Sequence, residues 1–195
     1  MAASEDHVVG ARERILSSAY ELFTRRGIRD VGVDEVIARA GIAKATLYRH
    51  FRTKDDLVLA VLERREKLWT FGFLQRQSQL RGGNAEQRLL AIFDVFDEWF
   101  TTDGFETCTF INVLLEMGAE HSTGRASIGH LATIRDLVRG RAEEAGFADP
   151  DDFARSWHLL MKGSIVSAAE GDRQAARRAR KLGAALIERS RVASA

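Results

Sequence analysis

The stretch VDEVIARAGIAKATLYRHF, residues 33–51, predicts two short helices joined by a tight turn. The first is expected over residues 33–40, where one helical face repeats an apolar side chain at Val33, Val36, Ile37 and Ala40. Gly41 is expected to end this helix, because glycine accepts a positive φ without a Cβ clash. A second helix is expected to begin near Ala43 and to run for about two and a half turns.

The second of these helices has a narrow apolar stripe and a wide polar face. Leu47 and Phe51 lie four positions apart and anchor one side. The other residues are expected to face outward: Lys44, Ala45, Thr46, Tyr48, Arg49 and His50. Cationic and hydroxyl donors on a slender helix suit phosphate oxygens and the base edges of a major groove. The pattern therefore predicts a DNA-binding helix-turn-helix, and a polar hairpin on the surface of any all-α domain is the alternative.

The run AGIAKATLYRHF, residues 40–51, followed by TKDDL, residues 53–57, resembles the DNA-binding signature of the TetR/AcrR family of bacterial transcriptional regulators. The resemblance places the helix-turn-helix motif over Gly32 to Phe51. It implies that Lys44, Ala45 and Arg49 read the DNA sequence. It further implies contacts to the DNA backbone and neighbouring bases by Thr46, Tyr48 and His50, and a phosphate contact by Lys54. The chain departs from the family pattern at Val31 and Gly32, where a Ser or Thr is usual, so no hydroxyl cap is expected.

Composition favours an all-α protein, since proline occurs once and β-rich runs are missing. The helical segments predicted along the chain number about nine. The first helix is expected over residues 11–26. Together with the two helices above it makes a three-helix unit, whose predicted core is Ile15, Leu22, Phe23, Val33, Val36, Leu47 and Phe51. A long fourth helix, N-capped by Thr53 and reaching about residue 80, is expected to bury Trp69, Phe71 and Phe73. Residues 1 to about 9 are predicted to be disordered.

Two domains follow from this division. Residues 1–54 are the predicted DNA-binding domain, and helix 53–80 links it to a helical bundle in residues 55–195. The family resemblance implies that this bundle binds an effector and dimerises. Further helices are expected over residues 85–101, 107–117, about 122–145, 150–170 and 172–191. An apolar effector pocket with a few polar anchors is predicted from Trp69, Phe73, Phe96, Trp99, Phe110, Asn112, His130, Trp157 and Met161. Ordinary core packing is the alternative for each of these residues.

Small residues on the last two helices suggest a partner: Gly163, Ser164, Ala168, Ala169, Ala176, Gly183, Ala184 and Ala185. The alternative is close packing within one chain. The family resemblance implies a homodimer through these two helices, which would present two recognition helices about 34 Å apart to a palindromic site.

Several other functions are not supported. The net charge is +1, and residues 1–54 hold ten Lys and Arg against seven Asp and Glu, so DNA affinity must come from local placement of charge. Cys108, Glu116, His121 and His130 match no metal-ligand or catalytic spacing, and no cofactor is predicted. The basic run at residues 177–181 is a second nucleic-acid patch or, more simply, a solvated helix face. The single cysteine, the acidic start without an apolar core and the absence of a long apolar run predict a cytoplasmic protein.

The leading interpretation is a dimeric, ligand-responsive DNA-binding regulator, with repression released by a small molecule. The alternatives are a helical enzyme with an apolar pocket and a helical adaptor that binds only proteins. Salt-dependent DNA binding and a screen for turnover would separate the three.

Overall fold

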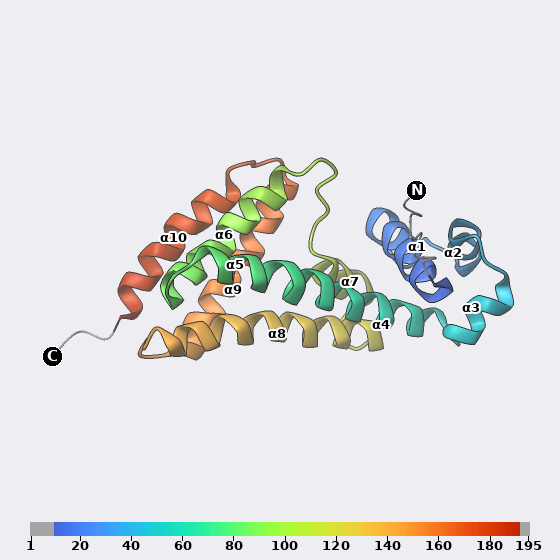
Figure 1. Cartoon of the computed structure of the whole chain (residues 1–195), viewed down its shortest axis with the longest axis horizontal. Coiled ribbons are helices and arrows are strands. Elements are labelled where there is room, and N and C mark those ends of the chain that lie inside the picture. Colours follow the sequence, from blue (N-terminus) through green and yellow to red (C-terminus); the bar gives the residue numbers. More distant parts are fainter. Residues whose placement is uncertain (1–9, 192–195) are drawn as a thin grey trace, which may run out of the picture.

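The computed structural model describes residues 10–191, and every regular element in that range is a helix (Figure 1). The prediction of disorder for residues 1–9 lies outside the described range. Counting α4, η1 and α5 as one continuous rod gives nine helices in residues 10–191, so the predicted fold class is confirmed.

The N-terminal unit contains α1 (Ala11–Arg26), α2 (Val33–Ala40) and α3 (Lys44–His50). The predicted glycine stop is found, since Gly41 follows α2 at φ 61°, and Gly27 ends α1 in the same way at φ 85°. In place of a hydroxyl cap on α2, the Glu35 side chain accepts the backbone N–H of Gly32 at 3.2 Å. Leu22 and Val33 are only half-buried, whereas the other predicted core residues are buried together with Leu16, Ala19, Ile28, Val31 and Ala40.

A continuous helical rod leads from this unit into the bundle, as α4 (Lys54–Arg65), η1 (Glu66–Gln75) and α5 (Arg76–Arg81). Its start at Thr53 is confirmed: the Thr53 hydroxyl accepts the N–H of Asp56 at 3.0 Å. The middle section η1 is a π-helix, which was not predicted. The expectation that Phe71 is buried is wrong, because the wider π-helical turn leaves its side chain 40% exposed.

The bundle contains α6 (Ala85–Thr101), α7 (Thr109–Met117), α8 (Ser122–Glu144), α9 (Pro150–Ala169) and α10 (Ala175–Ser190). In Figure 1, α8 runs beside the α4 rod, and α9 and α10 lie at the end of the molecule opposite α2 and α3. Large aromatic side chains fill the bundle core, and Trp157 packs between Phe93 and Phe153 with ring centroids 5.1 and 5.3 Å away.

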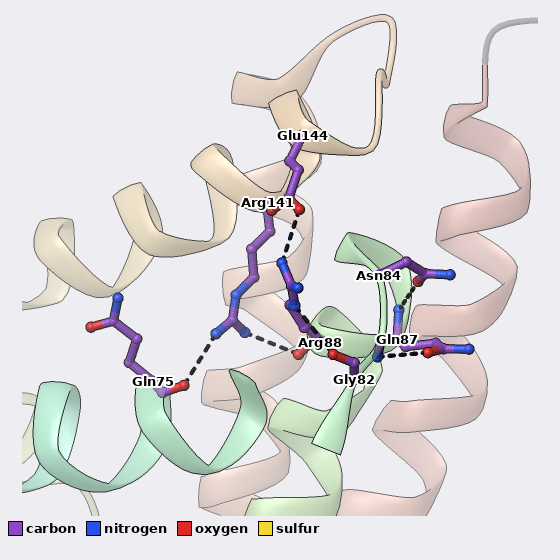
Figure 2. Close-up of polar contacts among 8 residues, drawn as sticks. Gln75, Gly82, Asn84, Gln87, Arg88, Arg141 and Glu144 are labelled. Atoms are coloured by element: carbon purple, nitrogen blue, oxygen red, sulfur yellow. Dashed lines mark hydrogen bonds and ion pairs between the residues drawn. The ribbon is translucent and has the colours of Figure 1, made fainter. Parts of the chain in front are cut away.

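Polar contacts close the turn between α5 and α6 (Figure 2). The Asn84 side chain accepts the N–H of Gln87 at 2.9 Å and so caps α6. The buried Arg141 on α8 donates to the backbone carbonyls of Gln75, at the end of η1, and of Arg88, in the first turn of α6, which ties α8 to the helices before and after this turn.

Candidate nucleic-acid interface

Helix α3 exposes the face that the sequence predicts. Leu47 and Phe51 are buried at 1% and 4% exposure, so they anchor the helix to the three-helix core. Tyr48 is 42% exposed. The other predicted DNA-binding side chains of α3 lie beside it: Lys44, Ala45, Arg49 and His50 are exposed and Thr46 is half-buried. One face of α3 therefore offers cations and hydroxyls to a partner outside the protomer.

The cationic side chains near α3 differ in whether they form an ion pair within the protomer. Lys44 Nζ lies 3.1 Å from Asp34 Oδ1 on α2, and this contact raises the pKa of Lys44. Arg49 and Arg52 form no ion pair within residues 10–191. Arg49 can thus approach a phosphate or a base directly, whereas Lys44 must first leave Asp34. The sequence did not single out Asp34, although its position on the exposed side of α2 was a usable signal.

Lys54 is placed where a phosphate contact is possible. It is the first residue of α4, half-buried, immediately after the Thr53 cap. The N-terminal end of a helix carries partial positive charge and favours anions. Lys54 therefore stands at the edge of the α3 surface with a charge of the right sign.

The predicted effector-pocket residues do not all meet. Three of them, Trp69, Phe96 and Met161, line one internal cavity of only about 10 Å³, together with Cys108, Ile111, Leu131, Ile134, His158, Lys162 and Ile165. Asn112 lies elsewhere, at a cavity of about 210 Å³ between α1 and α7. The other five predicted residues, Phe73, Trp99, Phe110, His130 and Trp157, line neither cavity.

A polar pair stands among the aromatic residues of the bundle. His130 Nδ1 lies 2.8 Å from Glu66 Oε1, and the His130 ring stacks on Phe110 at 4.9 Å. Nearby on the same two helices, Thr70 and Ser127 are fully buried and their hydroxyls have no hydrogen-bond partner in residues 10–191. Unpartnered buried hydroxyls are rare in proteins, so they mark a place where a polar group could be bound.

His158, on the wall of the smaller cavity, predicts a pH dependence of stability. Burial, followed by the nearby charges of Lys162 and Arg135, lowers the pKa of His158 to about 3. The unfolded chain therefore takes up this proton first, near pH 6.5, and stability falls as the pH drops from about 6.5 toward 3. At pH 5 the expected loss in the free energy of unfolding is about 2 kcal/mol.

Urea unfolding at pH 7 and pH 5 should show this loss in wild type and not in His158→Gln. His50→Gln, an exposed control, should keep it, and an equal loss in His158→Gln would contradict the assignment.

The remaining candidate features form no second site. The basic run on α10 is largely paired: Arg177 with Asp97 at 3.0 Å, Arg178 with Asp172 at 3.0 Å and Arg180 with Asp94 at 2.9 Å. A solvated helix face accounts for it. In the part of the chain that the structure describes, no three His, Cys, Asp or Glu side chains are placed to hold a metal ion. No helix there is both long and apolar enough to cross a membrane.

Comparisons with known proteins identify the family of the chain. Residues 15–61 match the family model for bacterial regulatory proteins of the tetR family. The chain is 30% identical over 168 residues to the transcriptional regulator AcuR of Cereibacter sphaeroides, covering 81% of this chain and 76% of AcuR. The chain belongs to the TetR family. The protein is a DNA-binding transcriptional regulator rather than an enzyme. We call α1 to α3 with the start of α4, which contain the matched residues, the DNA-binding unit.

One solved structure and one further relative add to this comparison. SCO4454, a TetR-family transcriptional regulator from Streptomyces coelicolor, superimposes with a TM-score of 0.83 at 26% identity, over 92% of this chain and 95% of that one. The transcriptional activator FasR of Mycolicibacterium smegmatis is 37% identical over 92 residues, which is 47% of this chain and 41% of FasR. The helical bundle as well as the DNA-binding unit is therefore of the TetR type.

Proposed function

We propose that this TetR-family regulator is a repressor that binds a palindromic operator as a homodimer and leaves it when a small molecule binds the bundle. The observation that carries the DNA-binding part is the exposed face of α3, anchored by Leu47 and Phe51. Residues 1–54 would form the DNA-binding domain, and residues 55–195 the effector and dimerisation domain. Such a regulator would act in the cytoplasm, where bacterial DNA lies.

Sequence reading would fall to Lys44, Ala45 and Arg49. Contacts to the DNA backbone and neighbouring bases would come from Thr46, Tyr48, His50 and Lys54. Their placement on one side of α3 and at the start of α4, exposed except for the half-buried Thr46 and Lys54, supports contact with DNA. Activation is the other possible sign of regulation, since FasR bears the name of an activator.

Dimerisation through α9 and α10 is supported by an apolar face that the protomer leaves open. Leu159 is 70% exposed, Val166 49% and Leu182 59%. Surface hollows of about 270 and 380 Å³ lie between the two helices around Leu159 and Leu182. A second copy would fill these hollows with its own leucines, because a twofold interface meets the same patch on both sides. Gly183 does not belong to this face: a Cβ there would lie 2.8 Å from Trp157, so Gly183 serves packing within the chain.

Release by a ligand is supported by the position of the small cavity. Trp69 on η1 forms one of its walls, and η1 continues directly into α4 of the DNA-binding unit. A space of about 10 Å³ holds no more than about one water molecule, so an apolar ligand must enlarge it by displacing neighbours such as Trp69. That displacement would move α4 and change the separation of the two α3 helices, which lowers the population of the DNA-competent state. A ligand that binds the bundle and leaves operator affinity unchanged would contradict this coupling.

Selection of bound DNA from a random pool tests the proposal. Wild type is expected to enrich a palindrome with two half-sites about 10 base pairs apart, centre to centre. Leu159→Glu/Leu182→Glu should be monomeric by sedimentation and enrich single half-sites, because two charges oppose burial of the α9 and α10 face. Arg155→Glu, an exposed position on α9 outside the hollows, is the matched control. Enrichment of no sequence would refute the proposed function, and a palindrome selected by the double variant would refute the interface.

A further inference from the structure

Glu116, in the last turn of α7, holds the loop that precedes the helix-turn-helix. Its Oε2 accepts the backbone N–H of Ile28 at 2.9 Å, and its Oε1 accepts the backbone N–H of Arg29 at 2.6 Å. Hydrogen bonds to an ionised acceptor are about twice as strong as neutral ones. Because both carboxylate oxygens are used, the loop is fixed in direction as well as in position. A side chain of the bundle is thus hydrogen-bonded directly to the DNA-binding unit, in addition to the covalent connection through α4.

The stability of α7 itself does not account for a carboxylate at this place. The C-terminal end of a helix carries partial negative charge, so an acidic side chain in its last turn is unfavourable. Glu116 also forms no ion pair with any cation of residues 10–191. Its hydrogen-bond partners are the two loop N–H groups. We therefore assign to Glu116 the role of holding this loop.

Gly27 makes room for this contact. Its φ of +85° is one that side-chain-bearing residues rarely adopt, and a Cβ built on it would lie 3.1 Å from Oε1 of Glu116. The residue that ends α1 therefore also leaves space for the carboxylate. Gly27 thus both adopts the positive φ that ends α1 and leaves space for the Glu116 carboxylate, next to the N–H groups that Glu116 binds.

Other polar contacts connect the same parts of the molecule at different points, among them His121 Nε2, which lies 3.6 Å from Asp55 Oδ2. Tyr20 on α1 donates to Glu106 at 3.0 Å, and Ser122 at the start of α8 donates to Asp55 on α4 at 2.9 Å. Apart from such side chains, α1, α2 and α3 pack mainly on one another and on α4. Among these contacts, the one made by Glu116 holds the loop that enters α2. It therefore bears most directly on the angle of the helix-turn-helix.

We infer that Glu116 is a positioning residue that sets the angle at which each protomer presents α3. In a dimer that angle determines the separation of the two recognition helices and hence the preferred spacing of the half-sites. The inference rests on the proposed binding of a two-half-site operator by a dimer. Without Glu116 the DNA-binding unit would vary in its orientation relative to the bundle. The dimer would then bind operators whose half-site spacing wild type binds only weakly.

Operators with identical half-sites and a central spacer changed by one or two base pairs test this role. In Glu116→Gln the amide group turns a donor toward one of the loop N–H groups, so one hydrogen bond is lost. The ratio of Kd between a shifted and the optimal spacer should fall by about tenfold, the size of one charge-assisted hydrogen bond. The penalty for a base change inside a half-site should stay as in wild type. A residue that acted only through stability would weaken binding to all of these DNAs alike.

Amide hydrogen exchange gives a second measurement that needs no DNA. The amides of Ile28 and Arg29 should exchange faster in Glu116→Gln, while amides in the core of α1 keep the wild-type rate. Glu120→Gln is the matched control, since Glu120 is exposed and its side chain makes no hydrogen bond within residues 10–191. An unchanged spacer preference in Glu116→Gln overturns the inference, whatever the amides do. If wild type binds no DNA with two half-sites, the proposed function fails and the inference fails with it.

Discussion

Replacing Arg141 with alanine is expected to lower the free energy of unfolding by about 3 kcal/mol, or the Tm by roughly 6 to 12 °C. The Arg141 side chain is 7% exposed and donates to the Arg88 carbonyl at 2.9 Å (Figure 2). It donates also to Ser78 Oγ at 2.8 Å. It also donates to the Gln75 carbonyl at 3.4 Å, at the end of η1. Returning from π-helical to α-helical bonding skips one carbonyl of the ladder, so extra donors are needed at this junction.

The charge of Arg141 makes the result informative. Burial, followed by repulsion from Arg88, lowers the pKa of Arg141 to about 10, so the guanidinium remains charged at pH 7. Arg141→Met keeps most of the volume and removes the donors, which separates hydrogen bonding from packing. Arg139→Ala is the matched control, because this neighbour, whose side chain is 43% exposed, forms only loose ion pairs of 3.6 to 3.7 Å and should change stability by about 0.5 kcal/mol or less. Denaturant unfolding that finds Arg141→Met as stable as wild type would show that burying the charge cancels its hydrogen bonds.

The sequence predicted best where a local signal fixes the backbone. The bounds of α1 and α2 follow from apolar spacing and from Gly27 and Gly41, because a positive φ ends a helix regardless of the rest of the fold. The outward face of α3 was predictable for the same reason, since two apolar anchors settle which side is buried. Identity as a TetR-type regulator followed from a motif that lies within this unit.

Prediction was weakest where side chains from distant helices meet. Asn112 shares the apolar surroundings expected of a pocket residue, yet it faces α1 and donates to Thr107 at 2.7 Å. Periodicity reports which face of a helix is buried and does not report which neighbour it meets. The π-helical turns of η1 also left no signal, because α- and π-helices use the same residues. The contact of Glu116 with Ile28 crosses 88 positions, and no spacing rule reaches so far.

Arg49→Ala is expected to relax operator selection by about 1 to 3 kcal/mol at particular base pairs, which is roughly 5- to 150-fold in relative affinity. Arg49 is exposed on α3 and has no ion pair within residues 10–191, so it meets DNA without first losing a partner. Lys44→Ala should relax selection by less, because Lys44 gives up its contact with Asp34 on binding. Asp34→Asn should then tighten binding of all sequences, since it frees Lys44 and removes a negative charge beside the DNA.

Lys54→Ala is the comparison that separates recognition of bases from electrostatic contact with phosphates. A phosphate contact carries no sequence information, so this variant should weaken all DNAs about equally and reduce the slope of log K against log salt by about one. Fluorescence anisotropy over a panel of single-base operator variants, repeated at several salt concentrations, measures both effects. If Arg49→Ala weakened every sequence equally and kept the wild-type order of preference, Arg49 would be a phosphate contact. Base reading would then have to come from the shorter side chains of α3, where Ala45 and Thr46 lie.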